Sequence, residues 1–197
     1  MSYAELQVTS HFSFLRGASS PEELFATAAR LGIPALGIAD RHSVAGLVHA
    51  HEAAKETGVR LVVGCRVDLA GGPSLLLYPT DRAAYGRMCR VLTLGKSRAG
   101  KGQCHLGWDD LGAWNEGMIG ILLTQGPDDA LKNNLARTRA IFGDRSYCAL
   151  TRRFLPNDAE RPALCRAREC GPALGGDRGE MQILARPALL QLPDRGP

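Results

Sequence analysis

The stretch IPALGIADRHSVAGLVHAHEAAKETGVRLVVGC, residues 33–65, holds two short apolar runs on either side of an amphipathic segment. The first run, 35–39, ends at Asp40, and the second is rich in valine and leucine, as buried strands are. Between them, Ser43 is placed to cap a helix that Gly58 ends. A strand, a helix and a strand in this order predict a βαβ unit with parallel strands.

The same alternation continues on both sides of this unit. Ser20 and Glu23 form the pattern of a capping box, and Gly32 marks the end of the helix that follows. Both an open doubly wound sheet and a barrel fit an α/β chain with mostly parallel strands. No G-x-G-x-x-G motif follows a predicted strand, so the dinucleotide-binding fingerprint is missing. Strands are expected over 6–9, 35–39, 59–69, 73–79, 118–124 and 146–151, and helices over 20–32, 43–58, 80–95 and 127–143.

Apolar positions recur at helical spacing in three of the predicted helices, and we expect these stripes to face the core. The stripes are Leu24, Ala28 and Leu31; Ala84, Met88, Val91 and Leu92; and Leu131, Leu135, Thr138 and Phe142.

The 197 residues suffice for one domain, or for one domain with an appendage, and a hydrophobic content of 45% supports a sizeable core. No apolar run approaches the roughly 20 residues of a membrane span, and the N-terminus lacks the features of a signal peptide. We therefore expect a cytoplasmic protein with no membrane partner. The six cysteines form no C-x-x-C pair, which favours reduced thiols and argues against a zinc site. A net charge of +4 is compatible with a nucleic-acid partner but does not require one.

Two segments depart from the alternation. Residues 95–117 read as a long, glycine-rich and basic insertion, in which Lys96, Arg98 and Lys101 are candidate phosphate contacts. The alternative is a solvated loop without a ligand. From residue 161 onwards proline, glycine and arginine are scattered without a period. We therefore divide the chain into a domain over 1–160 and an irregular tail over 161–197.

Four stretches carry a resemblance to a known family: ELQVTSHFSFLRGAS, EELFATAARLGIPALGIAD, GVRLVVGCRVDL and SLLLYPTDRAAYGRMCRVLT. Together they resemble the PHP domain, and most closely the N-terminal PHP domain of bacterial C-family DNA polymerases. The resemblance covers residues 2 to about 160. It implies a (β/α)7 barrel, incomplete in this chain, whose strand ends carry His, Asp and Glu ligands, often for three metal ions that activate water against a phosphoester. Two stretches, ELQVTSHFSFLRGASSPEEL and KGQCHLGWDDL, resemble the error-prone branch of these polymerases.

The resemblance also implies where the metal ligands should stand, and this chain departs from that pattern. The H-x-H motif reads Gln7 and Thr9, the Asp-His pair reads Asp40 and Arg41, the glutamate position is Arg66, and the fourth-strand histidine is Ser74. Of these six positions only Asp40 keeps a ligand. Arginine cannot bind a metal, and its charge opposes a nearby cation. We therefore expect no metal and no cofactor, and an ion pair of Arg41 and Arg66 with Asp40 that fills the old site.

Three other side chains are weighed for chemistry. His11 and His42 are predicted on the same loop face as Asp40, and two histidines with a carboxylate can bind a metal. Their spacing matches no known motif, and ordinary hydrogen-bonded loop histidines are the alternative. Ser13 lies near a histidine but no G-x-S-x-G elbow surrounds it, so a serine hydrolase is not favoured.

These observations favour one function over two others. The preferred interpretation is a PHP-domain fragment of an error-prone DNA polymerase that lacks the palm, performs no catalysis and braces the rest of the polymerase, which would bring it to DNA. Its tail is then explained by a frameshift near residues 161–171 that truncated a longer gene. The alternatives are a free-standing metal-dependent PHP phosphoesterase and a small basic DNA-binding module that acts through residues 96–101.

Overall fold

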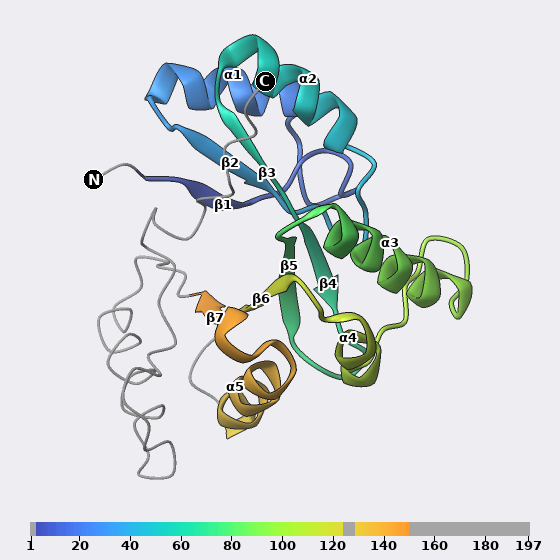
Figure 1. The fold of residues 1–197 in the computed structure, drawn as a ribbon. Helices are drawn as coiled ribbons and strands as arrows, with labels where there is room; N and C mark the ends of the chain where they lie inside the picture. Colours follow the sequence, from blue (N-terminus) through green and yellow to red (C-terminus); the bar gives the residue numbers. More distant parts are fainter. Residues whose placement is uncertain (1–2, 124–128, 150–197) are drawn as a thin grey trace.

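The computed structural model describes residues 3–123 and 129–149. Its first half forms a three-stranded parallel sheet in the order β1-β2-β3, with two helices packed on one side (Figure 1). The predicted βαβ unit is confirmed, because β2 and β3 pair in parallel across α2. The elements are β1 Glu5–Val8, α1 Pro21–Leu31, β2 Ala35–Ile38, α2 Leu47–Thr57 and β3 Arg60–Val63.

The second half forms a four-stranded sheet in the order β4-β5-β6-β7. The pairs β4–β5 and β5–β6 are antiparallel, whereas β6–β7 is parallel across α5. The first antiparallel pair arises because β4 turns directly into β5 without a crossover helix. Three of the five pairs are parallel, so the expected α/β chain with mostly parallel strands is confirmed. The elements are β4 Cys65–Asp68, β5 Ser74–Pro79, α3 Arg82–Ser97, α4 Trp108–Trp114, β6 Met118–Leu123, α5 Asp129–Phe142, a 3-10 turn Gly143–Arg145 and β7 Ser146–Ala149.

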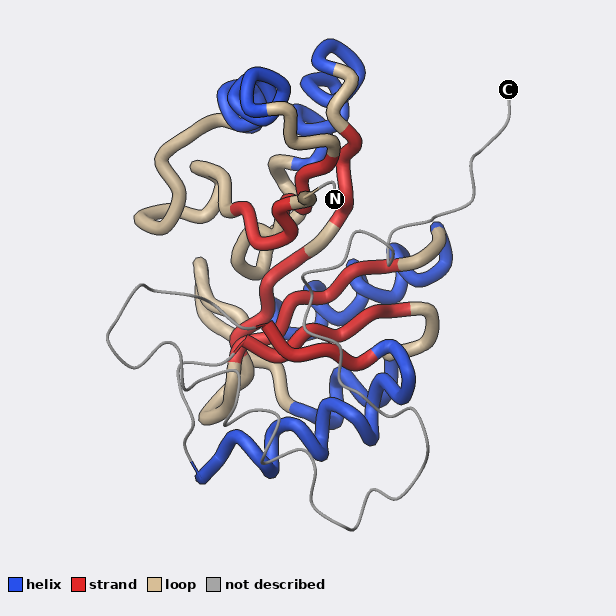
Figure 2. Tube along the Cα trace, turned by 90° about the vertical axis from the view of Figure 1, so that its left-hand side faces the viewer, coloured by secondary structure: helices blue, strands red, loops and turns tan. Residues whose placement is uncertain are grey.

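The expected single strand over 59–69 is wrong, because it breaks at Gly64 into β3 and β4, which lie nearly in line and lead from one sheet into the other (Figure 2). A Cβ on Gly64 would lie 2.4 Å from the Tyr78 ring, so only glycine fits at this bend. Backbone hydrogen bonds continue across it: Gly64 N donates to Ile38 O (3.0 Å) and Arg66 N donates to Asp40 O (3.0 Å). The two sheets therefore form one curved wall, which does not close into a barrel within the described residues.

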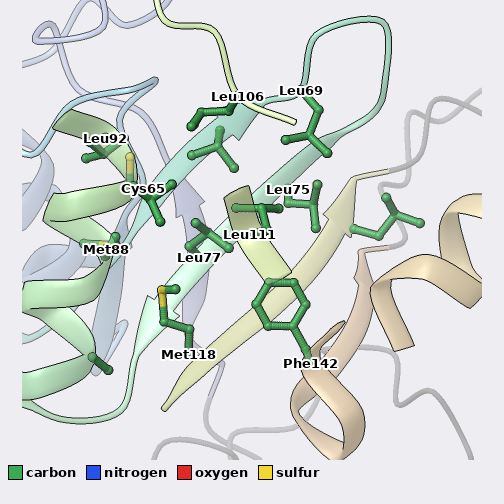
Figure 3. Packing of buried hydrophobic residues seen from close by; sticks show 14 of the residues in the cluster. Cys65, Leu69, Leu75, Leu77, Met88, Leu92, Leu106, Leu111, Met118 and Phe142 are labelled. Carbon is green, nitrogen blue, oxygen red and sulfur yellow. The ribbon is translucent and has the colours of Figure 1, made fainter. Parts of the chain in front are cut away.

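The alternation of side chains along the strands separates an inner core from two outer cores. The inner core crosses both sheets, and within it the Tyr78 hydroxyl of β5 donates to the Leu6 carbonyl of β1. One outer core packs β2 under α1 and α2, around Phe25 and Ile38. The other packs β4–β7 against α3, α4 and α5, and Figure 3 shows Met88 and Phe142 among its buried side chains. The inner core consists of Ala35, Ala39, Val62, Leu76, Tyr78, Ile121 and Tyr147.

The predicted apolar stripes of α3 and α5 are confirmed, because all eight side chains are buried. In α1 the prediction is wrong at Leu31, which is 65% exposed. Ala28 is buried as predicted, and the other buried residues of α1 are Pro21 and Phe25. The buried face is therefore rotated around the helix axis relative to the predicted stripe. The capping box of Ser20 and Glu23 is present, and Gly32 ends the helix with a φ of 68°.

Two other expectations about helices are wrong. Ser43 does not cap α2: its hydroxyl accepts from Ala45 N in a preceding turn, and the N-cap is Gly46. A Cβ on Gly46 would lie 2.7 Å from the Phe12 ring, which explains the glycine. Residues 95–117 are not one long loop either, since α3 runs on to Ser97 and α4 forms around the buried Leu111.

Cys65 is a buried free thiol, Cys89 and Cys104 are partly buried free thiols, and Cys148 is buried. Burial raises the pKa of Cys65 to about 12, so this thiol stays protonated. Cys165, Cys170, the predicted tail over 161–197 and the end of the predicted strand 146–151 lie outside the described residues. Among the helices of the described part, none is long and apolar enough to cross a membrane.

Candidate functional site

The candidate site lies where the chain leaves β2 and enters β4. Beyond the end of β2, Arg41 forms an isolated parallel bridge with Arg66, and His42 N donates to Arg66 O (2.8 Å). Residues 40–42 and 66–68 are therefore held side by side by their backbones. Because β1, β2 and β3 run parallel, the end of β2 belongs to the carboxyl edge of their sheet, at which α/β proteins place their ligands.

Asp68 is the centre of a charged cluster at this edge. One carboxylate oxygen accepts from Nε of Arg41, and the other accepts from Nε of Arg66 (3.0 Å) and from the Ser74 hydroxyl (2.6 Å). Nη2 of Arg66 also donates to the Ser74 hydroxyl (2.9 Å). Burial opposes ionisation of Asp68, but the hydrogen bonds from Ser74, Arg41 and Arg66 outweigh it and hold its pKa well below the ordinary value. Asp68 is therefore ionised at neutral pH, with two cations beside it.

Asp40 is held in a different way, by uncharged donors. Its carboxylate accepts from Ser10 N (2.8 Å), from the Ser10 hydroxyl (2.7 Å) and from the Ser13 hydroxyl (2.7 Å). Asp40 is 1% exposed, and both serines are also buried. The Ser13 hydroxyl in turn accepts from Arg41 N (2.9 Å). Asp40 therefore fastens the loop after β1 to the end of β2.

The expectation that Arg41 and Arg66 form an ion pair with Asp40 is wrong, because their acidic partner is Asp68. Both arginines bond to Asp68, two positions beyond Arg66 on β4. On a strand, positions i and i+2 point to the same face, so Arg66 and Asp68 meet directly. Asp40 is occupied by the two serines, which supply its hydrogen bonds without a second charge.

The structure brings Arg41, Arg66 and Ser74 together, with Asp40 adjacent in the chain, but it does not join Gln7 and Thr9 to them. Gln7 is exposed on β1 and Thr9 is half-buried, and within the described part of the chain neither side chain makes a hydrogen bond. That these positions once held metals stays a prediction.

The two candidate histidines lie in different surroundings. The exposed ring of His11 stacks on Phe12, with ring centroids 4.6 Å apart. His42 has a φ of 51°, a left-handed conformation that is unusual for a residue with a Cβ. Its Nε2 faces Asp68 N (3.4 Å), and its buried Nδ1 has no hydrogen-bond partner among the described residues. Burial is the largest cause of the lowered pKa of His42, so its ring is neutral at pH 7.

The side chains at this edge are not suited to bind the divalent metals that the family resemblance implies. Such ions need carboxylate or imidazole ligands with free lone pairs, and Asp40 already accepts three hydrogen bonds while Asp68 faces two guanidinium groups. In the described residues there is no group of three or more His, Cys, Asp or Glu side chains that could hold a metal.

A cleft of about 590 Å³ opens beside this edge, between the loop after β1 and the end of α3. Of the three candidate phosphate contacts, Lys96 and Lys101 line it. Arg98 does not, because its Nη1 is bonded to both carboxylate oxygens of Asp110 (2.8 and 3.0 Å). The lining consists of Phe12, Ser13, Phe14, Arg16, Arg41, His42, Ser43, Lys96, Ala99, Gly100, Lys101, Gly102 and Gln103.

Sequence reasoning missed the roles of Asp68 and Ser10. For Asp68 a signal was available, because an arginine and an aspartate alternate with buried residues along β4. For Ser10 no local signal exists, since its partner Asp40 lies 30 residues away in the sequence.

The chain matches the PHP domain over residues 5–153. It belongs to the PHP domain family. Similar proteins include error-prone DNA polymerase 3 of Agrobacterium fabrum, which is 60% identical over 161 residues, and an error-prone DNA polymerase of Caulobacter vibrioides, which is 44% identical over 197 residues. The first alignment covers 82% of this chain and 15% of the relative, and the second covers 99% and 18%. The PHP chain thus spans less than a fifth of the length of these relatives, and the Caulobacter alignment extends into residues 161–197.

Two solved structures share the PHP fold at low sequence identity. One is a protein from Bifidobacterium adolescentis provisionally named a metal-dependent phosphoesterase, with a TM-score of 0.59 and 13% identity. The other is an amidohydrolase from Chromobacterium violaceum, with a TM-score of 0.56 and 17% identity. Each alignment covers 85% of this chain and 84% of the solved chain. At these identities the likeness establishes the fold and nothing about the reaction.

Proposed function

We propose that this chain is the PHP module of an error-prone DNA polymerase of the bacterial cytoplasm, and that it supports the other parts of that polymerase without hydrolysing phosphoesters. The similarity to error-prone polymerases supports the first half of the proposal. The Arg41–Asp68–Arg66 cluster supports the second half, and it is the observation that carries the proposal.

Hydrolysis of a phosphoester at a metal centre depends on the activation of water. A metal-dependent phosphoesterase generates its nucleophile by lowering the pKa of a metal-bound water, and it stabilises the phosphorane charge with the same ions. At the strand ends of this chain, Arg41 and Arg66 bring two positive charges against the single negative charge of Asp68. A divalent cation would have to displace both guanidinium groups to reach that carboxylate. The side chains instead bond to one another across β2, β4 and β5, which suits a rigid support.

The test is an assay of the 197-residue chain on bis(p-nitrophenyl) phosphate with added Mn²⁺, together with metal analysis of the purified protein. We expect no hydrolysis above buffer and no stoichiometric metal. A variant with Gln7→His, Thr9→His, Arg41→His and Arg66→Glu restores four family ligands and should bind more Mn²⁺ than the parent chain does. Hydrolysis by the unaltered chain that depends on tightly bound metal would contradict the proposal and favour a free-standing phosphoesterase.

The support role has its own test in the intact polymerase. If this module braces the remainder, disrupting it with Asp40→Ala in the full-length enzyme lowers the thermal midpoint of the polymerase region as well as that of the module. Independent melting of the two parts would argue against a bracing role.

The boundary at residue 160 and the frameshift in the tail are proposals of their own. Resequencing the locus tests the frameshift: an unbroken family continuation in another frame immediately downstream supports it, and the absence of that continuation from every frame refutes it. The tail lies outside the described residues, so the structure does not bear on either proposal.

A further inference from the structure

Positively charged side chains line the cleft beside the site, and none of its described lining residues is acidic. Arg16 comes from the loop after β1, Arg41 from the end of β2, and Lys96 and Lys101 from the end of α3 and the loop that follows it. Among the described residues that line it there is no aspartate or glutamate. Three segments that are distant in the sequence therefore converge on one cleft with cations of the same sign, which raises the local concentration of anions.

Little within the described structure compensates these charges. Arg16, Lys96 and Lys101 take part in no salt bridge among residues 3–123 and 129–149. Arg41 bonds to Asp68 through Nε, and in that same part of the chain its two terminal nitrogens have no hydrogen-bond partner. By contrast, Arg98, only two residues after Lys96, is neutralised by Asp110. The cations that line the cleft are the ones left available for a ligand.

Aromatic side chains lie on the same cleft. Phe12 stacks between the rings of His11 and His49, at centroid distances of 4.6 and 5.7 Å, which fixes its position. Phe14 lines the cleft as well and is 85% exposed, which is unusual for a side chain of its size. A base has an apolar face that stacks on an aromatic ring, whereas a free phosphate has none.

We propose that this cleft binds single-stranded DNA, with phosphates against Arg16, Arg41, Lys96 and Lys101 and a base stacked on Phe14. The choice of DNA rests on the proposed function, because DNA is the polyanion that a polymerase module meets. A single strand fits better than a duplex, because in a duplex the bases are paired and cannot reach an exposed ring. A volume of about 590 Å³ is in the range of small-ligand sites and admits one or two nucleotides rather than a helix.

The experiment measures fluorescence anisotropy of a labelled oligonucleotide of about twelve thymidines, because that length exceeds one binding site. The 197-residue chain is titrated across salt concentrations, and the double variant Lys96→Gln/Lys101→Gln is compared with Arg30→Gln/Lys55→Gln. The control removes the same charge from exposed positions of α1 and α2 away from the cleft. We expect the cleft variant to bind more weakly and its log–log salt slope to be shallower by about 1.4, or about 0.7 for each phosphate that no longer meets a cation. The control should keep the slope.

Two further arms separate the ligands. Phe14→Ala should weaken binding about tenfold with an unchanged salt slope, because stacking carries no charge, and Phe14→Tyr should preserve binding. Unlabelled oligonucleotide should displace the probe at lower concentration than dTTP, and inorganic phosphate should compete least.

Equal salt slopes in the cleft and control variants would refute the proposal. Equal competition by inorganic phosphate or dTTP would refute DNA as the ligand and leave a small-anion site. Either result leaves the proposed function intact, because that function is tested separately, by phosphodiester hydrolysis with bound metal and by the melting of the full-length enzyme. Circular dichroism and the thermal midpoint of each variant confirm that binding is compared between folded proteins.

Discussion

Asp40 follows β2 and Asp68 ends β4, in two segments that backbone hydrogen bonds hold side by side, yet the protein stabilises the two carboxylates by opposite means. Asp40 is fully buried and accepts hydrogen bonds from two serine hydroxyls and one backbone N–H. The side chain of Asp68 is 20% exposed and is paired with two arginines and one serine. Neutral hydrogen-bond donors stabilise the carboxylate of Asp40, whereas two charged guanidinium groups stabilise that of Asp68.

The difference separates a structural task from an electrostatic one. Dipolar donors hold Asp40 in place and fasten the loop after β1, but they add no charge to the site. The two arginines occupy the carboxylate of Asp68, which keeps it from a divalent cation, and Arg41 also lines the positive cleft. The same strand ends therefore combine a carboxylate held by uncharged donors with a carboxylate held by cations.

The largest effect is expected from removing the anchor. Asp40→Ala leaves three buried donors without an acceptor, and it should lower the free energy of unfolding by about 4 kcal/mol. Thermal denaturation measures this as a midpoint decrease of roughly 10 °C for a chain of this size. Asp40→Asn keeps one acceptor oxygen and should lose about half as much, so equal losses in the two variants would show that the hydrogen bonds are not the cause.

Asp68→Asn should cost less, about 2 kcal/mol, because the arginines it leaves behind are partly exposed and can be hydrated. Urea denaturation at pH 7 gives the value. The matched control is Asp144→Asn, whose exposed pair with Arg139 should contribute less than about 0.5 kcal/mol. The comparison between the two carboxylates would break if Asp68→Asn proved more damaging than Asp40→Ala.

Acid should weaken the protein through Asp68. Because its pKa in the folded protein is lower than in the unfolded chain, its contribution is present above about pH 4 and is lost as the pH falls towards the folded value. The slope from this one group is at most about 1.4 kcal/mol per pH unit. Unfolding measured between pH 5 and 2 (about one to two units on either side of the ordinary value) should show a smaller slope in Asp68→Asn. Identical slopes would rule out Asp68 as the source.

The smallest effect concerns His42. Its lowered pKa means that the unfolded chain takes up a proton near pH 6.5 while the folded protein does not, so stability falls as the pH drops below about 6.5. His42→Asn keeps a residue that tolerates the left-handed backbone and removes the titration. We expect less than about 1 kcal/mol of difference at pH 7 and a flatter profile between neutrality and the acid limb. A profile unchanged by the substitution would contradict this assignment.

Local chemistry made much of the fold predictable. The capping box at Ser20, the αL glycine at 32 and the stripe from Leu131 to Phe142 all depend on residues within one to three helical turns. The break at Gly64 was not predictable, because it depends on Tyr78 approaching from another strand. The helix α4 was hidden by the glycines around it, and its burial comes from packing against the rest of the outer core.

The sequence located the candidate site correctly, but it did not reveal which side chains bond to one another there. The family resemblance located Arg41, Arg66 and Ser74, which do converge, but it offered no reason to consider Asp68. The distance in sequence between Arg41 and Asp68 is 27 residues, and only the register of the strands brings them together. Lys96 and Lys101 were found by charge, whereas the pairing of Arg98 with Asp110 depends on the position of α4, which was not predicted.

The backbone bonds between residues 38–42 and 64–66 have a consequence for protein engineering. Since main-chain atoms fix the spacing of these two segments, side chains at 41 and 66 can be exchanged without moving the scaffold that presents them. Acidic or imidazole side chains could therefore be introduced at these two positions one at a time, on a backbone whose hydrogen bonds do not depend on them.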